Sequence, residues 1–291
     1  MWQIYQNATV TISAATASHS NQGFLHARNL EFCYLSTWAI PWHDVDDENK
    51  LISDTVFCAE GEIRRVKPEP IDSRAWTMQE HKLARRLLRF GSSQMVWQCA
   101  EGCEVDGGSK EEDDPPHFST VDETQMFYHW QYDVEEFTTR FISKPGDRLP
   151  AFAAIAANYA KRLNAKSDQY MAGLWRQWMP FILLWYIKDV HDEPTYPDLP
   201  PDEEESPTWS WHLACSGVSW PYMPFQGESD SMTLDIEHCH VALADEKVEY
   251  GRVKKGSLKV VGALLRIRLL GTRPLWTMPD SSETFAPIDI K

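Results

Sequence analysis

The chain has few cysteines, no long apolar run and no stretch of positive charge. Its six cysteines are scattered irregularly over 291 residues, which is typical of a reduced intracellular protein rather than of a disulfide-stapled secreted domain. The first residues lack the charged region and apolar run of a signal peptide. The longest apolar run, residues 178–187, is too short to cross a bilayer. We therefore expect a cytoplasmic protein without a membrane span.

Negative charge is concentrated in two segments of the chain. Residues 101–114 hold seven acidic residues and one lysine, a net charge of −6, and residues 189–205 hold eight acidic residues and no lysine or arginine, a net charge of −8. Since the whole chain carries −15, the remainder is close to neutral. We expect solvated acidic loops near 101–117 and 189–207. No basic groove is indicated, so we expect no nucleic-acid partner.

Common catalytic and cofactor motifs are missing as well. The sequence has no G-x-S-x-G elbow, no glycine-rich phosphate loop and no H-E-x-x-H helix. His238 and His240 extend the face of a predicted strand that contains Ile236, and they could hold a metal with Cys99 or Cys103. The four-residue spacing of the cysteines makes this a poor metal clip. We favour ordinary polar residues at a strand end, and expect no metal and no cofactor.

Tryptophan is abundant, with 13 residues in the chain. Each offers a large apolar surface and one N–H group that needs a partner. Tryptophans from different segments could converge on a pocket for a planar or polyene-like small molecule, or they could fill a solid core, which we favour. The candidates for a substrate-binding role are Trp76, Gln79, Trp97, Trp175, Trp209 and Trp211.

Apolar periodicity predicts an α+β fold, with a mixed or antiparallel sheet packed by about three central helices. We expect one module over 1–291 that ends in a β region at about 208–291. Asp147 is the expected N-cap of one helix. Helices are predicted at 72–83, 122–141, 147–163 and 170–188, and strands at 9–12, 87–90, 95–98, 209–211, 232–236 and 265–269, while 28–72 reads as irregular.

The helix predicted at 72–83 carries the best candidates for acid–base chemistry. Its geometry places Trp76, Gln79 and Glu80 on one face, where Trp76 and Leu83 would pack inward. A part-buried Glu80 near Arg74 or Arg85 could act as an acid or base with a shifted pKa. The alternative, which we favour, is a structural network of ion pairs and hydrogen bonds that ties this helix to the strands.

Seven short pieces of sequence lie in a characteristic order between residues 2 and 220. They are IYQNATVTI (4–12), GFL (23–25), RAWTMQE (74–80), WQC (97–99), DRLPA (147–151), YMAGLW (170–175) and PTWSW (207–211). In this order they resemble fungal heterokaryon-incompatibility (HET) domain proteins. Proteins of that family have a longer N-terminal part before the first piece, so we expect a short member that lacks it.

The resemblance implies an intracellular binding module of fungal non-self recognition and cell-death signalling. The alternative is a HET-derived enzyme of small-molecule metabolism, such as an acid–base cyclase, isomerase or dehydratase with a tryptophan-lined pocket. In that enzyme Glu80 and Arg74 would be the catalytic residues. The partner is accordingly a protein or a hydrophobic small molecule. The oligomeric state stays open.

Overall fold

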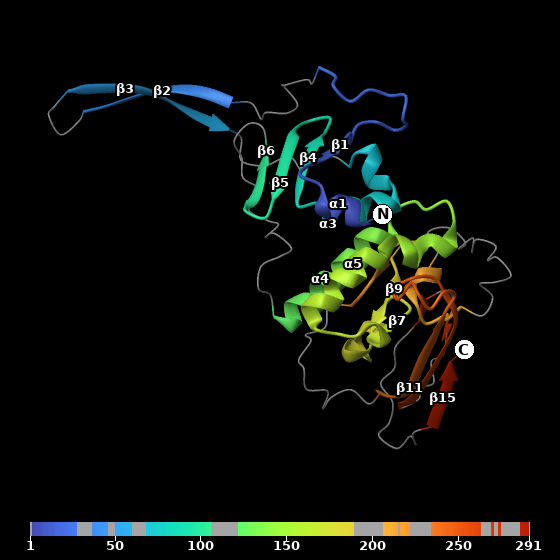
Figure 1. Ribbon diagram of the computed structural model, residues 1–291. Helices are drawn as coiled ribbons and strands as arrows, with labels where there is room; N and C mark the ends of the chain where they lie inside the picture. Colours follow the sequence, from blue (N-terminus) through green and yellow to red (C-terminus); the bar gives the residue numbers. More distant parts are fainter. Residues whose placement is uncertain are drawn as a thin grey trace. The chain divides into compact units, whose positions relative to one another are not determined.

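A computed structural model gives the fold in two compact units (Figure 1). Unit 1 comprises Met1–Ser73 and Ala84–Ser119, and unit 2 comprises Arg74–Leu83 and Thr120–Lys291. Both combine helices and sheets, which confirms the α+β class. The expectation of one module stays a prediction. The structure describes residues 2–27, 37–45, 50–59, 68–105, 122–188, 206–214, 216–221, 234–262, 269–270, 273–274 and 286–290.

Unit 1 contains a four-stranded mixed sheet, preceded by the short helix α1 (Trp2–Asn7). The strand order is β1-β4-β5-β6, with β1 parallel to β4 and the other neighbours antiparallel. Strands β4 and β5 form the hairpin that the sequence predicts. The acidic segment from 101 starts as a strand rather than a loop, and its residues 106–121 lie outside the described residues. The strands are β1 (Thr11–Ser13), β4 (Arg86–Phe90), β5 (Met95–Cys99) and β6 (Gly102–Val105).

A second β-hairpin in unit 1 corrects the prediction of irregular structure at 28–72. Strands β2 (Thr37–Val45) and β3 (Leu51–Ala59) pair antiparallel as a two-stranded sheet. Pro41 pairs with Thr55 inside this ribbon. Proline is accepted here because each strand of a two-stranded ribbon is an edge strand, so that the missing N–H need not break a ladder. The 3-10 helix η1 (Pro70–Ser73) follows.

Unit 2 contains the three longest helices of the described residues. They are α3 (Ala75–Leu83), α4 (Glu123–Thr138) and α5 (Arg148–Leu163), and they confirm the helices predicted at 72–83, 122–141 and 147–163. Helix α4 starts with a capping box, in which the Asp122 carboxylate accepts from the Gln125 N–H at 2.7 Å and the Gln125 side chain accepts in return at 3.2 Å.

Asp147 occupies the N-cap position of α5, after the 3-10 helix η2 (Pro145–Asp147), but makes no capping hydrogen bond. Its carboxylate instead accepts from Arg252 at 3.2 Å. Arg148, the first residue of α5, donates to the carbonyl of Ala214. The two residues therefore tie the start of α5 to later segments of unit 2.

Residues 170–188 do not form the helix that was predicted. Strands β7 (Tyr170–Met171) and β8 (Leu174–Trp175) make a tight hairpin, since Ala172 and Gly173 have φ values of 49° and 95°. This left-handed turn ends any helix. The broad apolar surface that suggested a central helix belongs to a segment buried without helical structure. It continues as η4 (Arg176–Trp178), η5 (Phe181–Leu183) and β9 (Tyr186–Ile187), after η3 (Ser167–Gln169).

The C-terminal part of unit 2 is mostly β-structure. Its three-stranded antiparallel sheet has the order β11-β12-β15, and β10 pairs with β9. Residues 209–211 do not form the predicted strand, because Trp209 lies in a turn and a 3-10 helix begins at Trp211. Of the predicted strand 265–269, only Leu269 is described. The elements are η7 (Trp211–Leu213), β10 (Val218–Ser219), β11 (Leu234–Leu243), β12 (Val253–Gly262), β13 (Leu269–Leu270), β14 (Arg273–Pro274) and β15 (Ala286–Ile290).

An aromatic core fills unit 2. Trp130 of α4 is fully buried at its centre and makes edge-to-face contacts with Phe152, Tyr159 and Trp175, with ring centroids 4.9–5.6 Å apart. Such contacts stabilise a core beyond the burial of apolar area alone. Because the indole rings pack on one another, they form a solid core and not an open cleft.

Candidate functional site

The helix α3 places the predicted acid–base residues in different surroundings. Gln79 is buried, Glu80 is partly buried and Arg74 is exposed just before the helix. Trp76 does not pack inward as expected, because it keeps 37% of its surface exposed. Trp76 lies at the border of the buried side of α3. The buried residues of this helix are Ala75, Thr77, Met78, Gln79 and Leu83.

A network of charged groups links α3 to α4 and α5, and the sequence did not predict its members. Lys82 of α3 contacts the carboxylate of Asp133 at 2.7 Å and that of Glu136 at 3.4 Å, both on α4. The Tyr159 hydroxyl of α5 donates to Asp133 at 3.0 Å. Asp133 is almost fully buried, so these donors offset the cost of its desolvation.

Arg140 closes the network by pairing with Glu136 and donating to Thr77 at 3.4 Å. Burial alone would raise the pKa of Glu136, but Lys82 and Arg140 outweigh it and hold this pKa below its usual value. A carboxylate fixed in its charged form by two cations is a poor proton donor near neutral pH. The network around α3 is therefore suited to holding helices together.

The tryptophans proposed for substrate binding are divided between the two units. Trp175, Trp209 and Trp211 belong to the buried core of unit 2, whereas Trp97 lies on β5 of unit 1. The N–H groups of Trp175 and Trp209 have no hydrogen-bond partner among the described residues. The role of this set in binding stays a prediction.

A serine–histidine pair in the PTWSW segment (207–211) has a structural geometry. Ser210 Oγ lies 2.7 Å from His212 Nδ1 and donates its proton to the Ala172 carbonyl, so Nδ1 must be the donor to Oγ. Burial, with Arg148 nearby, lowers the pKa of His212 to about 3. A neutral ring with its proton on Nδ1 cannot take the proton of Ser210. The pair therefore does not form a nucleophile and base.

The same segment locks the β7–β8 hairpin. Trp211 Nε1 donates to the carbonyl of Gly173 at 2.7 Å, beside the bond from Ser210 to Ala172. A Cβ atom at Gly173 would lie 2.6 Å from the Trp211 Nε1 atom, so only glycine fits. The two pieces YMAGLW and PTWSW, which are 32 residues apart in sequence, thus form one interlocked unit.

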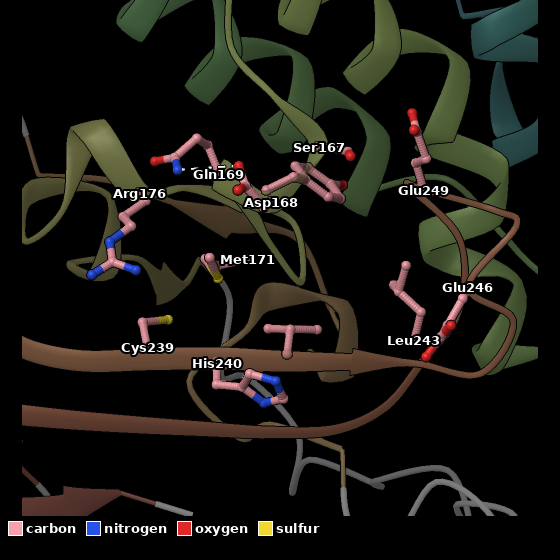
Figure 2. Close-up of a pocket in the computed structure, with 12 residues that line it drawn as sticks. Ser167, Asp168, Gln169, Met171, Arg176, Cys239, His240, Leu243, Glu246 and Glu249 are labelled. Carbon is pink, nitrogen blue, oxygen red and sulfur yellow. Dashed lines mark hydrogen bonds between the residues drawn. The ribbon is translucent and has the colours of Figure 1, made fainter.

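A cavity of about 480 Å³ opens in unit 2 between η3, the β7–β8 hairpin and β11 (Figure 2). Its floor contains the buried thiol of Cys239, whose pKa burial raises to about 11 although Arg176 opposes this. A thiol with this pKa stays protonated at neutral pH and is not a nucleophile. The lining residues are Ser167, Asp168, Gln169, Tyr170, Met171, Arg176, Cys239, His240, Val241, Leu243, Glu246 and Glu249.

Opposite charges lie at the two ends of this cavity. Arg176 stands beside Cys239 at one end, and Glu246 and Glu249 stand at the other (Figure 2). Met171 lies between them. The arrangement could not be predicted from sequence, because it joins residues from η4 and from the turn between β11 and β12.

The rings of His238 and His240 point the same way, as expected, and stack with centroids 6.3 Å apart. They do not continue the face of Ile236, because the pairing of β11 with β12 shifts between Ile236 and His238. This bulge puts both rings on the exposed face and turns Cys239 inward. Within the described ranges, no three His, Cys, Asp or Glu side chains are grouped to hold a metal ion.

These features define an α+β protein with an aromatic core and a surface cavity that is basic at one end and acidic at the other. A family model described as "Heterokaryon incompatibility protein (HET)" matches residues 1–80. The resemblance to the HET family is therefore confirmed over this part, while the pieces after residue 80 stay predictions. No curated protein and no solved structure gives a match. Among the helices that the structure describes, none combines the length and apolar character that a bilayer crossing needs.

Proposed function

We propose that the chain is a binding module of fungal non-self recognition that acts through a protein partner in cell-death signalling. The match to the heterokaryon incompatibility family supports the biological setting. The packing of unit 2 supports binding over catalysis, because its tryptophans fill a core and its Ser210–His212 pair has the wrong proton placement.

One observation carries this proposal: the β2–β3 hairpin exposes apolar side chains on one face, within the matched residues. Ile40, Trp42 and Ile52 are 43–50% exposed. The register pairs Ile40 with Val56 and Asp44 with Ile52, which places the three exposed side chains on the same face. Exposed apolar groups gathered on one face are a common mark of a protein-binding surface.

The test compares two neighbouring residues on opposite faces of this hairpin. The full chain is expressed from an inducible promoter in a filamentous fungus, and surviving colonies are counted. We expect wild type to reduce survival at least about tenfold and Ile52→Lys to abolish the effect, since burying an unpaired charge in an apolar interface costs several kcal/mol.

Leu51→Lys is the matched control, because Leu51 is 66% exposed and faces away from Ile52. It should reduce survival as wild type does, at equal protein level. Survival that is unaffected by wild type would contradict the signalling role. Equal loss of effect with both variants would contradict the assignment of the partner surface to the Ile52 face.

A second candidate is the HET-derived enzyme with Glu80 and Arg74 as acid–base residues. The cavity of about 480 Å³ has the volume of a small-molecule site, but neither Glu80 nor Arg74 lines it. None of the proposed tryptophans lines that cavity. Glu80→Gln tests the idea: if the variant retains full effect in the survival assay, acid–base catalysis by Glu80 is not needed for that effect.

A further inference from the structure

The cavity of unit 2 has the features of a built binding site beyond a hollow in the surface. Its two ends carry opposite charge, and Met171 lies between them (Figure 2). Leu243 and Val241 of β11 add further apolar lining. A binding partner that matches this pattern must carry two opposite charges separated by an apolar spacer.

The basic end is formed by Arg176, which follows β8 at the start of η4. Its guanidinium group makes no ion pair with any residue that the structure describes, and it is exposed to solvent. An arginine free to offer its planar pair of N–H groups suits a carboxylate. The basic end therefore selects for an anionic group.

The acidic end is formed by Glu246 and Glu249, in the turn between β11 and β12. Both are exposed, and neither pairs with a basic residue in the described part of the chain. Asp168, which also lines the cavity, accepts from Gln169 at 3.2 Å. Two carboxylates at one end of the cavity without a paired cation suit an ammonium group.

The side chain of Tyr170 forms part of the wall of this cavity. Tyr170 lines it and is 95% buried, since its exposed fraction is 5%, yet its hydroxyl has no hydrogen-bond partner among the described residues. Its ring is held by Trp175 and Tyr250, with centroids 5.2 and 5.3 Å away. The packed ring therefore gives the cavity a fixed aromatic wall.

We propose that this cavity binds a small zwitterion, a molecule with an ammonium group at Glu246 and Glu249 and a carboxylate at Arg176. The apolar spacer runs along Met171 and Leu243. The three carboxylates of the lining are not grouped with a further donor as metal ligands in the described residues, so they suit an organic amine better. The proposal is independent of the partner surface on the β2–β3 hairpin.

The test uses three probes that share one spacer: 6-aminohexanoate, hexylamine and hexanoate. Binding to the full chain is measured by isothermal titration calorimetry at neutral pH. We expect 6-aminohexanoate to bind at least about tenfold more tightly than either single-charge probe, because only it engages both ends.

Variants assign each charge to its end. Arg176→Gln should lower the affinity for 6-aminohexanoate to that for hexylamine and leave hexylamine unchanged. The double variant E246Q/E249Q should lower it to the affinity for hexanoate. Tyr170→Phe removes only a hydroxyl that solvent does not reach, so it should leave the affinity for 6-aminohexanoate unchanged.

Lys254→Gln and Asp235→Asn are the matched controls, since both residues are exposed and neither lines the cavity. They should bind all three probes as wild type does. The proposal is overturned if wild type binds no probe at about 10 mM, or if it binds all three equally. It is also overturned if the controls weaken binding as much as Arg176→Gln does.

Discussion

Unit 1 and unit 2 hold their elements together by different means. Unit 2 has a continuous aromatic core, and three indole N–H groups in it donate to backbone carbonyls of distant segments at 2.7–2.9 Å. The described part of unit 1 buries few apolar side chains, namely Ala15, Leu87 and Val105. We infer that unit 2 carries most of the stability.

Unit 1 relies more on polar contacts between short segments. Glu69 accepts from the backbone N–H and the hydroxyl of Ser92 at 2.6 and 2.7 Å, and Asp72 pairs with Arg89 at 2.5 Å. These bonds hold the segment before α3 against the β4–β5 turn. Part-buried polar contacts of this kind contribute about 1 kcal/mol each. Because unit 1 also buries few apolar side chains, we expect it to be the less stable unit.

The largest expected effect comes from emptying the core of unit 2. Trp130→Ala should lower the free energy of unfolding by about 4 kcal/mol, because it removes a fully buried ring and leaves a cavity. Urea denaturation followed by circular dichroism measures the change. Trp42→Ala in unit 1 should cost less than about 0.5 kcal/mol, since Trp42 is 44% exposed. Similar costs for the two variants would refute the contrast between the units.

A smaller effect separates the interlocked hairpin of unit 2 from an open turn in unit 1. Gly173→Ala should cost about 3 kcal/mol, because it adds a clash with Trp211 to the strain of a positive φ. Gly102→Ala should cost only about 1 kcal/mol, since Gly102 also has a positive φ but nothing lies within 4 Å of its added Cβ. The difference in thermal midpoint between these variants measures the interlock. Equal shifts of the thermal midpoint in the two variants would show that Trp211 moves aside to accommodate the methyl group.

The pH dependence of stability tests the burial of His212 in unit 2. Its pKa in the folded state, about 3, lies below the usual 6.5, so the unfolded chain takes up the proton first. Stability should therefore fall as the pH drops below 6.5, by about 1.4 kcal/mol per pH unit, or about 2 kcal/mol at pH 5. Urea denaturation at pH 7 and pH 5 measures the loss.

His212→Asn is the control for this prediction, because its amide N–H can replace the Nδ1 donor to Ser210 and does not titrate. Glu136, with its lowered pKa, stays ionised over the same range and adds no loss there. An equal loss in wild type and in His212→Asn would mean that another group causes it.

The smallest effect concerns the polar contacts of unit 1. Glu69→Ala should lower the free energy of unfolding by about 1 kcal/mol, because Ser92 is exposed and water can replace the lost acceptor. Hydrogen exchange of the Ser92 amide should accelerate. Glu104→Ala, at an exposed position of β6, is the control and should change neither quantity. A cost near that of Trp130→Ala would place the stability of the chain in unit 1 instead.

The sequence predicts the elements whose local signals agree with their surroundings. Helix α5 has one apolar stripe, α4 has a side-chain cap, and β4 and β5 are joined by a glycine turn. Residues 170–188 and 209–211 fail because the spacing of their apolar residues fits a helix and a strand, whereas the left-handed turn at Ala172 and Gly173 and the 3-10 helix at Trp211 set the backbone. The hairpin at 37–59 was missed because Pro41 reads as a breaker.

The candidate sites were predictable to different degrees. The motif at 74–80 marks a helix, but its network depends on Asp133 and Glu136 of α4, which no local pattern connects to it. The cavity joins Arg176 to Glu246 across 70 residues of sequence, so only the tertiary fold brings them to one hollow. The exposed apolar residues of the β2–β3 hairpin lie at alternate positions, as in a strand, but Pro41 between them argues against a strand in the sequence.

The lock between Gly173 and Trp211 also bears on the acidic segment at 189–205. Strands β9 and β10 pair on either side of that segment, and the lock joins Gly173, which precedes β9, to Trp211, which lies between the segment and β10. A protease cut within it would therefore leave two fragments still held by these contacts. The chain can in this way be nicked or lengthened there without losing the core, which makes the segment a natural point for inserting a tag or a reporter domain.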